Sequence, residues 1–171
     1  MLRATLTPHC VASMTLMTIG YEGADIHTFT TVLKVNNVTT LIDVRELPLS
    51  RKKNFSKSAL AAAMEGSRIS YLHLRALGCP REIRNDYHAD GNWRLYSKRF
   101  NAYLGTQVDA LDELQSICRL QNCCLVCFEA DYRRCHRSLV TAALTRTCHV
   151  KVEHLTVRRP DPVEGPGLAV A

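Results

Sequence analysis

Short apolar runs alternate with amphipathic segments along most of the chain. The apolar runs have the length of strands, and the first of them contains β-branched residues. They lie at residues 15–21, 38–45, 69–74, 123–129 and 149–155. The pattern therefore predicts five strands separated by helical segments.

The segments between these runs carry apolar residues at helical spacing. Helices are predicted at 24–37, 57–67, 97–120 and 133–147. Ser56 stands where an N-cap would precede the second of these helices. The polar and aromatic stretch 78–94 has no clear periodicity and is predicted to be a long loop, of the kind that is usually functional or disordered.

Strands that alternate with helices, several of them apolar on both faces, are typical of α/β domains with parallel sheets. The sequence thus predicts one Rossmann-like α/β domain of three layers, with a mainly parallel sheet of about five strands, over residues 14–157. Residues 1–13 are predicted to be a flexible extension, because threonines, a proline and a histidine interrupt any signal-peptide core. The Pro- and Gly-rich residues 158–171 are predicted to be a disordered tail.

Composition narrows the class of protein. Apolar residues make up 46% and charged residues 22% of the chain, and no apolar run approaches the ~18 residues of a membrane span, so no membrane partner is expected. Many of the eight cysteines lie within 118–137 at apolar positions, which favours buried reduced thiols and a cytoplasmic protein over a disulfide framework. The net charge of +6 permits an anionic partner such as a nucleotide or a nucleic acid.

Polar segments stand at the ends of three predicted strands. GYEG (20–23) ends the first strand, DVRELPLSR (43–51) the second and CFEADYRRCHR (127–137) the fourth. The carboxyl ends of parallel strands meet at one edge of a sheet, where ligands bind, so the three segments are expected to build one site. GYEG alone is either a strand-to-helix turn or a place where Tyr21 and Gly23 let a ligand approach the main chain.

The second segment also has two interpretations. Asp43 and Arg45 lie two apart and point to the same face of a strand, so they form either a salt bridge or part of an anion site. In an anion site, Arg45 and Arg51 would donate to the anion while Asp43 orients a guanidinium. Ser50 would add a hydroxyl, and His73 from the third strand would lie nearby.

CFEADYRRCHR has three interpretations. Cys127 and Arg133 have the spacing of a cysteine-phosphatase loop, but the residues between them include no glycine with which to wrap a phosphate. A metal site would use Cys127, Glu129, Cys135 and His136, whose residue types zinc accepts. Adjacent positions on a helix point in different directions, however, so Cys135 and His136 are not expected to share one ion.

The third interpretation is a catalytic cluster. Glu129 would leave the strand end, and a helix from about Arg133 would present Cys135, His136 and Arg137 in its first turn. The helix dipole and the arginines would lower the pKa of Cys135, and His136 would carry protons. The simpler alternative is a buried structural Cys135 beside a solvated His136 and Arg137.

The ordered series GYEG, LIDVR, PLSR, FSK, YLHL and CFEADYRRCHR resembles the domain of unknown function 488 family. The resemblance covers about residues 17–155 and implies a Rossmann-type α/β fold and a shared site, without a substrate. The matching motif residues are Gly20, Tyr21, Gly23, Asp43, Arg45, Pro48, Ser50, Arg51, Phe55, Gly78, Cys127, Glu129, Cys135, His136 and Arg137. LGC at 77–79 departs from the family, in which a second glycine often follows, and makes Cys79 a candidate extra thiol.

The leading hypothesis is an enzyme, a hydrolase or transferase, that acts on a phosphorylated, nucleotide or nucleic-acid-derived substrate. The residues assigned to the chemistry are Asp43, Cys127, Glu129, Cys135 and His136. The residues assigned to the anion are Tyr21, Gly23, Arg45, Ser50, Arg51, His73 and Arg137.

One alternative is a nucleic-acid or nucleotide-binding module without catalysis. It would use the basic residues Arg81, Arg84, Arg94, Lys98 and Arg99, with Tyr87 and Trp93 for stacking. A second alternative is a metal-binding protein that uses the cysteines, histidine and glutamate of CFEADYRRCHR. No cofactor is otherwise predicted, and the sequence is compatible with a homodimer.

Overall fold

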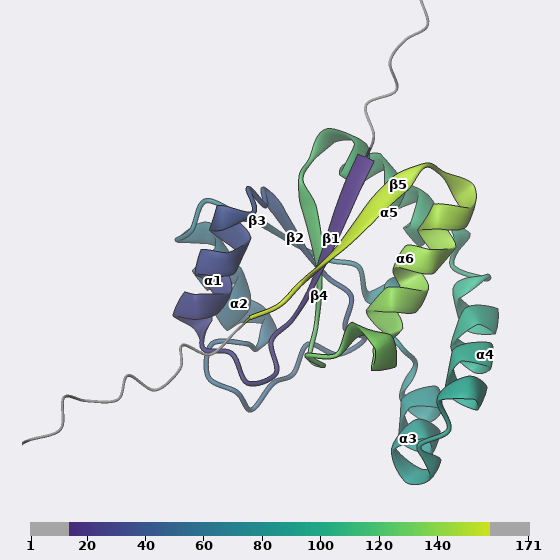
Figure 1. Ribbon diagram of the computed structural model, residues 1–171. Coiled ribbons are helices and arrows are strands. Elements are labelled where there is room, and N and C mark those ends of the chain that lie inside the picture. Colours follow the sequence, from purple (N-terminus) through teal and green to yellow (C-terminus); the bar gives the residue numbers. More distant parts are fainter. Residues whose placement is uncertain (1–13, 158–171) are drawn as a thin grey trace, which may run out of the picture.

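Five strands form one all-parallel sheet in the computed structural model, which describes residues 14–157 (Figure 1). They are β1 (Met14–Gly20), β2 (Thr40–Asp43), β3 (Ser70–His73), β4 (Cys123–Cys127) and β5 (Val150–Leu155). Their order across the sheet is β3-β2-β4-β1-β5. The five predicted strands and the α/β fold class are confirmed. The expectations for residues 1–13 and 158–171 lie outside the described residues.

Helices cover both faces of the sheet, which gives the predicted three layers (Figure 1). One face packs against α1 (Ile26–Val35) and α2 (Lys57–Glu65). The other face packs against α3 (Arg81–Asp90), α4 (Trp93–Leu104), α5 (Val108–Leu120) and α6 (His136–Thr147). Two short 3-10 helices, η1 (Arg75–Leu77) and η2 (Tyr132–Arg134), follow β3 and β4. None of the helices in residues 14–157 is long and apolar enough to cross a membrane.

Strand β4 supplies both apolar cores, because successive side chains of a strand point to opposite faces. Cys123 and Leu125 join the core beneath α3 to α6, whereas Cys124 and Val126 join the core beneath α1 and α2. These two thiols therefore pack as small apolar side chains. The same alternation turns Cys127, the last residue of β4, toward the layer that contains α6.

The segment predicted as one helix over 97–120 is two helices, so that prediction was wrong. Both halves are amphipathic, and periodicity alone does not register the change of direction between α4 and α5. Gly105 ends α4, in keeping with its low helix propensity. The turn that follows is closed by a hydrogen bond of 3.0 Å from the amide of Gln107 to the carbonyl of Leu104.

The stretch 78–94, predicted to be a loop, holds α3 and the start of α4, so this prediction was also wrong. Ile83 is the one buried residue of α3, so no apolar repeat marks the helix in the sequence. Gly91 ends α3 in the left-handed conformation, with φ 63°. The rings of Tyr87 and Trp93, whose centroids are 5.7 Å apart, hold α3 against α4.

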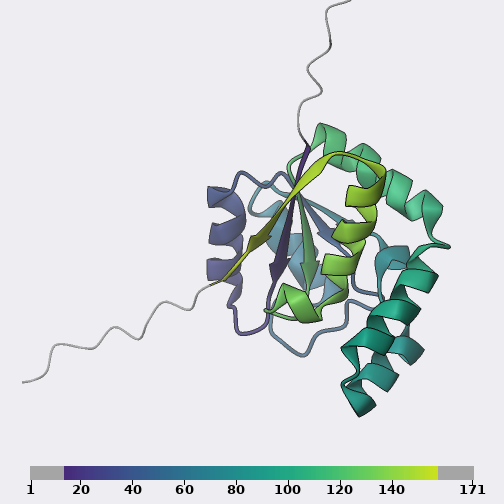
Figure 2. The same ribbon diagram turned by 45° about the vertical axis from the view of Figure 1, so that its right-hand side comes forward.

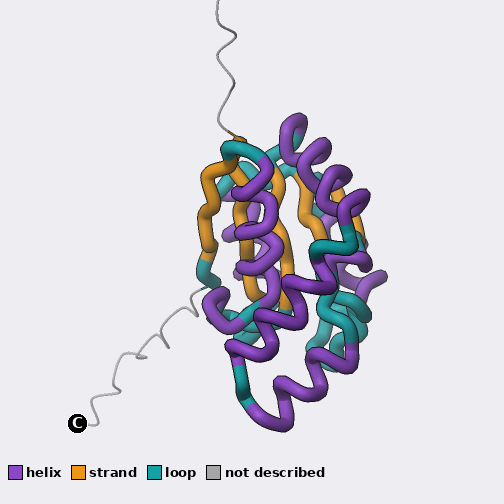
Figure 3. The backbone as a smooth tube through the Cα atoms, turned by 90° about the vertical axis from the view of Figure 1, so that its right-hand side faces the viewer, coloured by secondary structure: helices purple, strands orange, loops and turns teal. Residues whose placement is uncertain are grey.

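Helices α3 and α4 form a hairpin that extends past the carboxyl edge of the sheet (Figure 2). The tube view shows the same hairpin continuing below the strands (Figure 3). The polar segments that end the strands lie at this edge, as predicted for a parallel sheet. The hairpin therefore stands as a wall beside them.

Gly20 ends β1 where the chain that follows β4 passes close to it. A Cβ at this position would lie 1.9 Å from the carbonyl oxygen of Glu129, and a backbone atom cannot swing aside as a side chain can. We expect Gly20→Ala to lower the free energy of unfolding by about 1–3 kcal/mol, as overpacking does, in a urea titration.

Gly66→Ala is the matched control for this variant. Gly66 has a helical backbone with φ −60°, and the nearest atom to an added Cβ is 3.5 Å away. Its stability should be unchanged or slightly raised. A Gly20→Ala protein as stable as Gly66→Ala would contradict the close approach of β1 to Glu129.

Candidate functional site

A crevice lies between the carboxyl ends of the neighbouring strands β1 and β4, because the connections that follow these two strands pass over opposite faces of the sheet. The chain leaves β1 toward β2 through α1 on one face, and leaves β4 toward β5 through α6 on the other. Parallel α/β sheets bind ligands at such a point. A pocket of about 880 Å³ lies there. Its lining residues are Tyr21, Arg45, Glu46, Leu47, Leu49, Ser50, Arg51, Lys52, Cys79, Arg84, Tyr87, His88, Tyr96, Cys127, Phe128, Glu129, Arg134 and His136.

Asp43, the last residue of β2, forms a buried ion pair with Arg45. Arg45 folds back on Asp43, with 2.8 Å from Nε to Oδ1 and 2.5 Å from Nη2 to Oδ2. Its Nη1 donates to the hydroxyl of Tyr21 and to the carbonyl of Phe55, each at 2.8 Å. Tyr71 donates its hydroxyl to Asp43 at 2.6 Å. Burial opposes the charge of Arg45, but Asp43 outweighs burial and raises the pKa of Arg45.

This ion pair fits the salt-bridge interpretation of the sequence. Arg45 touches the pocket, but most of its donors are engaged within the protein. The ring of Tyr21 stacks on Phe55 with centroids 4.5 Å apart and meets Phe128 edge-on at 5.4 Å. The ion pair and these rings together form a rigid floor on the α1 side of the pocket.

Two thiols, a carboxylate and an imidazole meet on the α6 side of the pocket, from Cys127, Glu129, Cys135 and His136. The thiols of Cys127 and Cys135 donate to Oε2 of Glu129 at 2.9 and 3.0 Å. Nδ1 of His136 lies 3.6 Å from the sulfur of Cys127 and 3.9 Å from that of Cys135. One ligand atom of each residue lies within 4.8 Å of all the others. This Cys/His/Glu cluster could hold a metal ion.

The imidazole of His136 is held by a backbone carbonyl. Its Nε2 lies 2.7 Å from the carbonyl oxygen of Val44, which only accepts. Nε2 therefore carries the hydrogen, and Nδ1 of the neutral ring turns its lone pair toward the two sulfurs. The ring of Phe100 packs edge-on against the imidazole, with centroids 5.4 Å apart. Both contacts fix the direction in which Nδ1 points.

Burial and mutual contacts shift the pKa values of the cluster. Burial raises the pKa of Cys135 well above its ordinary value. A hydrogen bond with Cys135 favours the Cys127 thiolate, but burial and the Glu129 carboxylate outweigh it and raise the pKa of Cys127. Burial opposes the charge of Glu129, but the two thiol donors and His136 outweigh it and lower the pKa of Glu129. Burial likewise opposes the charge of His136, but Cys135 and Glu129 raise its pKa.

Three expectations for this segment were wrong. Helix α6 begins at His136 rather than at about Arg133, because the 3-10 helix η2 comes first. Cys135 is the N-cap of α6 in an extended conformation, with φ −128° and ψ 140°. The chain therefore bends between Cys135 and His136, and the two side chains face one point instead of different directions. The pKa of Cys135 is raised rather than lowered, because burial dominates.

Arg137 shapes the cluster from behind the pocket. Its buried guanidinium donates from Nη1 to the carbonyl of Glu129 at 2.5 Å and from Nη2 to the carbonyl of Ala130 at 3.0 Å. Arg137 thereby holds the turn that follows β4 and that passes against Gly20. The geometry assigns Arg137 to these backbone carbonyls rather than to an anion.

The other predicted anion-binding residues divide between the pocket and its surroundings. Tyr21, Ser50 and Arg51 line the pocket. His73 lies behind it, where its Nε2 donates at 2.8 Å to a backbone carbonyl just past β2. Gly23, with φ 74°, belongs to the turn before α1 and lies outside the lining. The turn interpretation therefore accounts for Gly23.

Part of the pocket wall was missed by reasoning from the sequence. The missed lining residues include Lys52, His88, Tyr96, Phe128 and Arg134. His88 and Tyr96 lie on the α3–α4 hairpin, which carried no helical signal in its first half. Lys52 and Arg134 stand next to other basic residues in the sequence, and only the fold shows that Lys53 and Arg133 lie outside the pocket lining while Lys52 and Arg134 belong to it.

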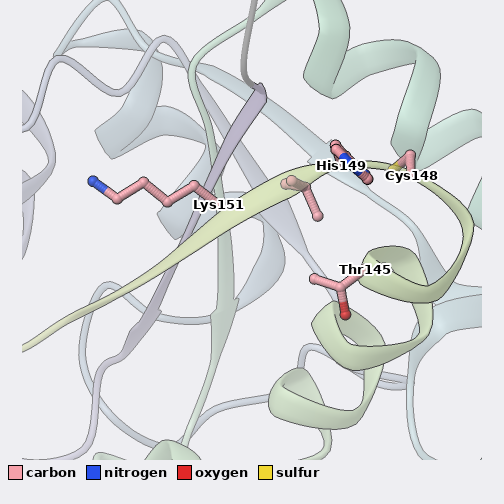
Figure 4. A pocket seen from close by; sticks show the side chains of 5 residues that line it. Thr145, Cys148, His149 and Lys151 are labelled. Atoms are coloured by element: carbon pink, nitrogen blue, oxygen red, sulfur yellow. The ribbon is translucent and has the colours of Figure 1, made fainter.

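A second pocket, of about 390 Å³, lies at the opposite edge of the sheet, at the end of α6 and the start of β5. It is lined by Thr145, Cys148, His149, Val150 and Lys151. Figure 4 shows Lys151 pointing away from Thr145, so these side chains do not converge on one point. The crevice between β1 and β4 is therefore the candidate active site.

The chain belongs to the family described as Domain of unknown function DUF488, which it matches over residues 25–144. This confirms the family that the sequence motifs indicate. No curated protein and no solved structure matches the chain. The matched range runs from α1 to α6 and includes both the Asp43–Arg45 pair and the Cys/His/Glu cluster.

The buried ion pair yields a stability prediction. Asp43→Asn leaves the Arg45 charge buried without a counter-charge, so we expect the free energy of unfolding in urea to fall by about 3–5 kcal/mol. Asp86→Asn is the control, because Asp86 pairs with Arg99 at the exposed surface, and it should leave the unfolding midpoint nearly unchanged. Similar midpoints for the two variants would show that Asp43 and Arg45 do not form a structural pair.

Proposed function

We propose that this DUF488 member is an enzyme that acts on an anionic substrate, namely a phosphorylated small molecule or a nucleotide, in the pocket at the carboxyl edge of the sheet. One observation carries the proposal. The Cys/His/Glu cluster opens into a pocket whose wall carries the cationic side chains of Arg51, Lys52, Arg84 and Arg134. A reactive cluster beside converging cations is the arrangement that chemistry on an anion requires.

The cations differ in how free they are to bind an anion. Arg84 donates to Glu46 at 3.2 Å, so part of its charge is already balanced. Within residues 14–157, Arg51, Lys52 and Arg134 take part in no ion pair. One guanidinium group can donate two parallel hydrogen bonds to two oxygens of the same phosphate, whereas a lysine ammonium acts as a point charge. Arg51 and Arg134 are therefore the main candidates to bind the anion.

The pocket also offers apolar surface. Leu47, Leu49 and Phe128 are exposed, and they line the pocket together with the half-buried Tyr87. Its volume of about 880 Å³ suits a ligand of nucleotide size. Cations beside aromatic and aliphatic side chains favour a substrate that joins a charged group to a flat ring.

Glu129 is the residue best placed to move a proton. Its carboxylate is partly exposed and lines the pocket, while the thiols of Cys127 and Cys135 both donate to the one oxygen Oε2. A carboxylate that reaches a pocket in this way is placed to accept a proton from an attacking water or hydroxyl as a general base. The proposed reaction class is therefore hydrolysis or group transfer at the anionic centre.

The structure favours a pocket over the extended basic surface that a nucleic-acid-binding module would use. Arg99 is paired with Asp86 and Arg84 with Glu46, so acidic neighbours balance part of the basic surface. Tyr87 and Trp93 pack against each other, which leaves less of each ring for stacking on bases. We therefore propose a small-molecule site.

The proposal is tested with the purified protein and a panel of phosphate monoesters, phosphodiesters and nucleoside phosphates. Once a substrate is found, Glu129→Gln should lower kcat by about 10²-fold or more, as loss of a general base does. Glu65→Gln makes the same chemical change at the exposed end of α2 and should leave kcat unchanged. Turnover unaffected by Glu129→Gln, or no turnover of any member of the panel, would overturn the proposal.

Arg134→Ala tests the assignment of the anion site. Loss of one charged hydrogen bond to the substrate should raise KM about tenfold while kcat changes little. Arg146→Ala removes an exposed arginine from the far end of α6 and serves as the control. If both variants keep the wild-type KM, the substrate does not bind at the Arg134 side of the pocket.

A further inference from the structure

The donor atoms of the Cys/His/Glu cluster converge from three successive parts of one segment. Cys127 ends β4, Glu129 stands in the turn that Arg137 holds, and Cys135 with His136 begins α6. Two sulfurs, one imidazole nitrogen and one carboxylate oxygen lie within 4.8 Å of one another. Four such lone-pair donors around one point are what a transition-metal ion requires.

The distances from His136 to the two sulfurs fit a tetrahedral ion. Ligand atoms of a tetrahedral zinc site, with bonds of about 2.0–2.3 Å, lie about 3.3–3.8 Å from one another. Nδ1 of His136 is 3.6 Å from the sulfur of Cys127 and 3.9 Å from that of Cys135. Oε2 of Glu129 is closer, at 2.9 and 3.0 Å from the sulfurs, so Glu129 is the residue that must draw back.

The contacts around His136 already orient its ring as in a metal-binding histidine. A metal-binding histidine usually donates its second ring nitrogen to a carbonyl or a carboxylate, which fixes the ring and its tautomer. Nε2 of His136 donates to the carbonyl of Val44 at 2.7 Å and leaves Nδ1 facing the sulfurs. Cys127, Cys135 and His136 are buried, whereas Glu129 is partly exposed toward the pocket.

We infer that Cys127, Cys135 and His136 bind a zinc ion, whose fourth position lies on the side of the pocket next to Glu129. Two thiolates and an imidazole select zinc over magnesium or calcium, which prefer oxygen ligands. Binding releases the two thiol protons to solvent, so both cysteines enter as thiolates.

The position of Glu129 beside the pocket indicates that the zinc ion takes part in catalysis, and this role rests on the proposed function. Catalytic zinc sites have three protein ligands and a fourth position open to water or substrate, where the ion makes bound water more acidic. Here the fourth position faces the pocket, and Glu129 is next to it as the proton acceptor. Metal binding itself does not depend on the proposed activity.

The same chain contains a control for thiol chemistry alone. Cys118 and Cys123 are neighbouring buried thiols in the core beneath α5. Among the residues that the structure describes, the Cys/His/Glu cluster is the group that combines thiols with an imidazole and a carboxylate. A variant of Cys118 therefore removes a buried thiol without touching the inferred ligands.

The test uses the full chain, stripped of metal with a chelator under reducing conditions and then titrated with Zn²⁺ or Co²⁺. We expect one equivalent of Zn²⁺ to bind, and Co²⁺ to give the intense d–d bands of a tetrahedral site together with a thiolate charge-transfer band. Loss of an outer-shell partner costs about 10–100-fold in metal affinity, so Cys135→Ser and His136→Ala should each lose at least about 100-fold. Cys118→Ser should bind as the wild type does.

Several outcomes would overturn the inference: no binding of Zn²⁺ by the wild type, a Co²⁺ spectrum without the thiolate band, or equal losses in Cys118→Ser and Cys135→Ser. The wild-type Co²⁺ spectrum decides the question even if a variant fails to fold. The metal titration contains no substrate, so its result does not depend on the proposed activity. A protein that binds Zn²⁺ but turns over no member of the substrate panel would support the zinc site and count against the proposed function. Turnover by the metal-free protein would support the proposed function and count against a catalytic role for the zinc ion.

Discussion

The close approach between the end of β1 and the turn after β4 is the constraint on which the site depends. Gly20 has no room for a side chain because the Glu129 carbonyl lies against it, and the guanidinium of Arg137 donates to the same carbonyl. The backbone of Glu129 is thus clamped between a strand end and a buried arginine. Its carboxylate is consequently delivered to the two thiols, although it stands in a turn rather than in a strand or helix.

Val44 links the two sides of the pocket. On either side of it, Asp43 and Arg45 turn toward the α1 layer and form the buried ion pair. The carbonyl of Val44 accepts from His136, which lies in the α6 layer. Any shift of the segment after β2 would therefore move both Arg45, which donates to Tyr21 and Phe55 of the floor, and the carbonyl that sets the direction of the His136 imidazole. This coupling explains why an ion pair with few free donors stands so near a reactive cluster.

Much of the site could be predicted from the sequence, because parallel strands bring their carboxyl ends to one edge whatever the details of their packing. Asp43, Cys127 and Glu129 lie at or near the ends of apolar runs that can be recognised as strands from their composition alone. The mutual orientation of Cys135 and His136 could not be predicted in this way, since it depends on where a helix begins, and helix boundaries are weakly encoded. Helix α3 was missed for a different reason: it buries Ile83 alone, and its other contacts are to α4 and to the pocket.

The burial of the two thiols separates the chemistries that this pocket could support. A cysteine nucleophile needs an accessible thiolate, yet Cys135 is buried and its pKa is raised. Cys127 reaches the pocket, but its thiol donates to Glu129, whose negative charge opposes a second one beside it. A cation at the centre of the cluster would offset the burial and the negative charge that disfavour the thiolates, because it stabilises both thiolates and the carboxylate at once. The arrangement of four donors around one point is thus easier to explain as a ligand set than as a thiol active site.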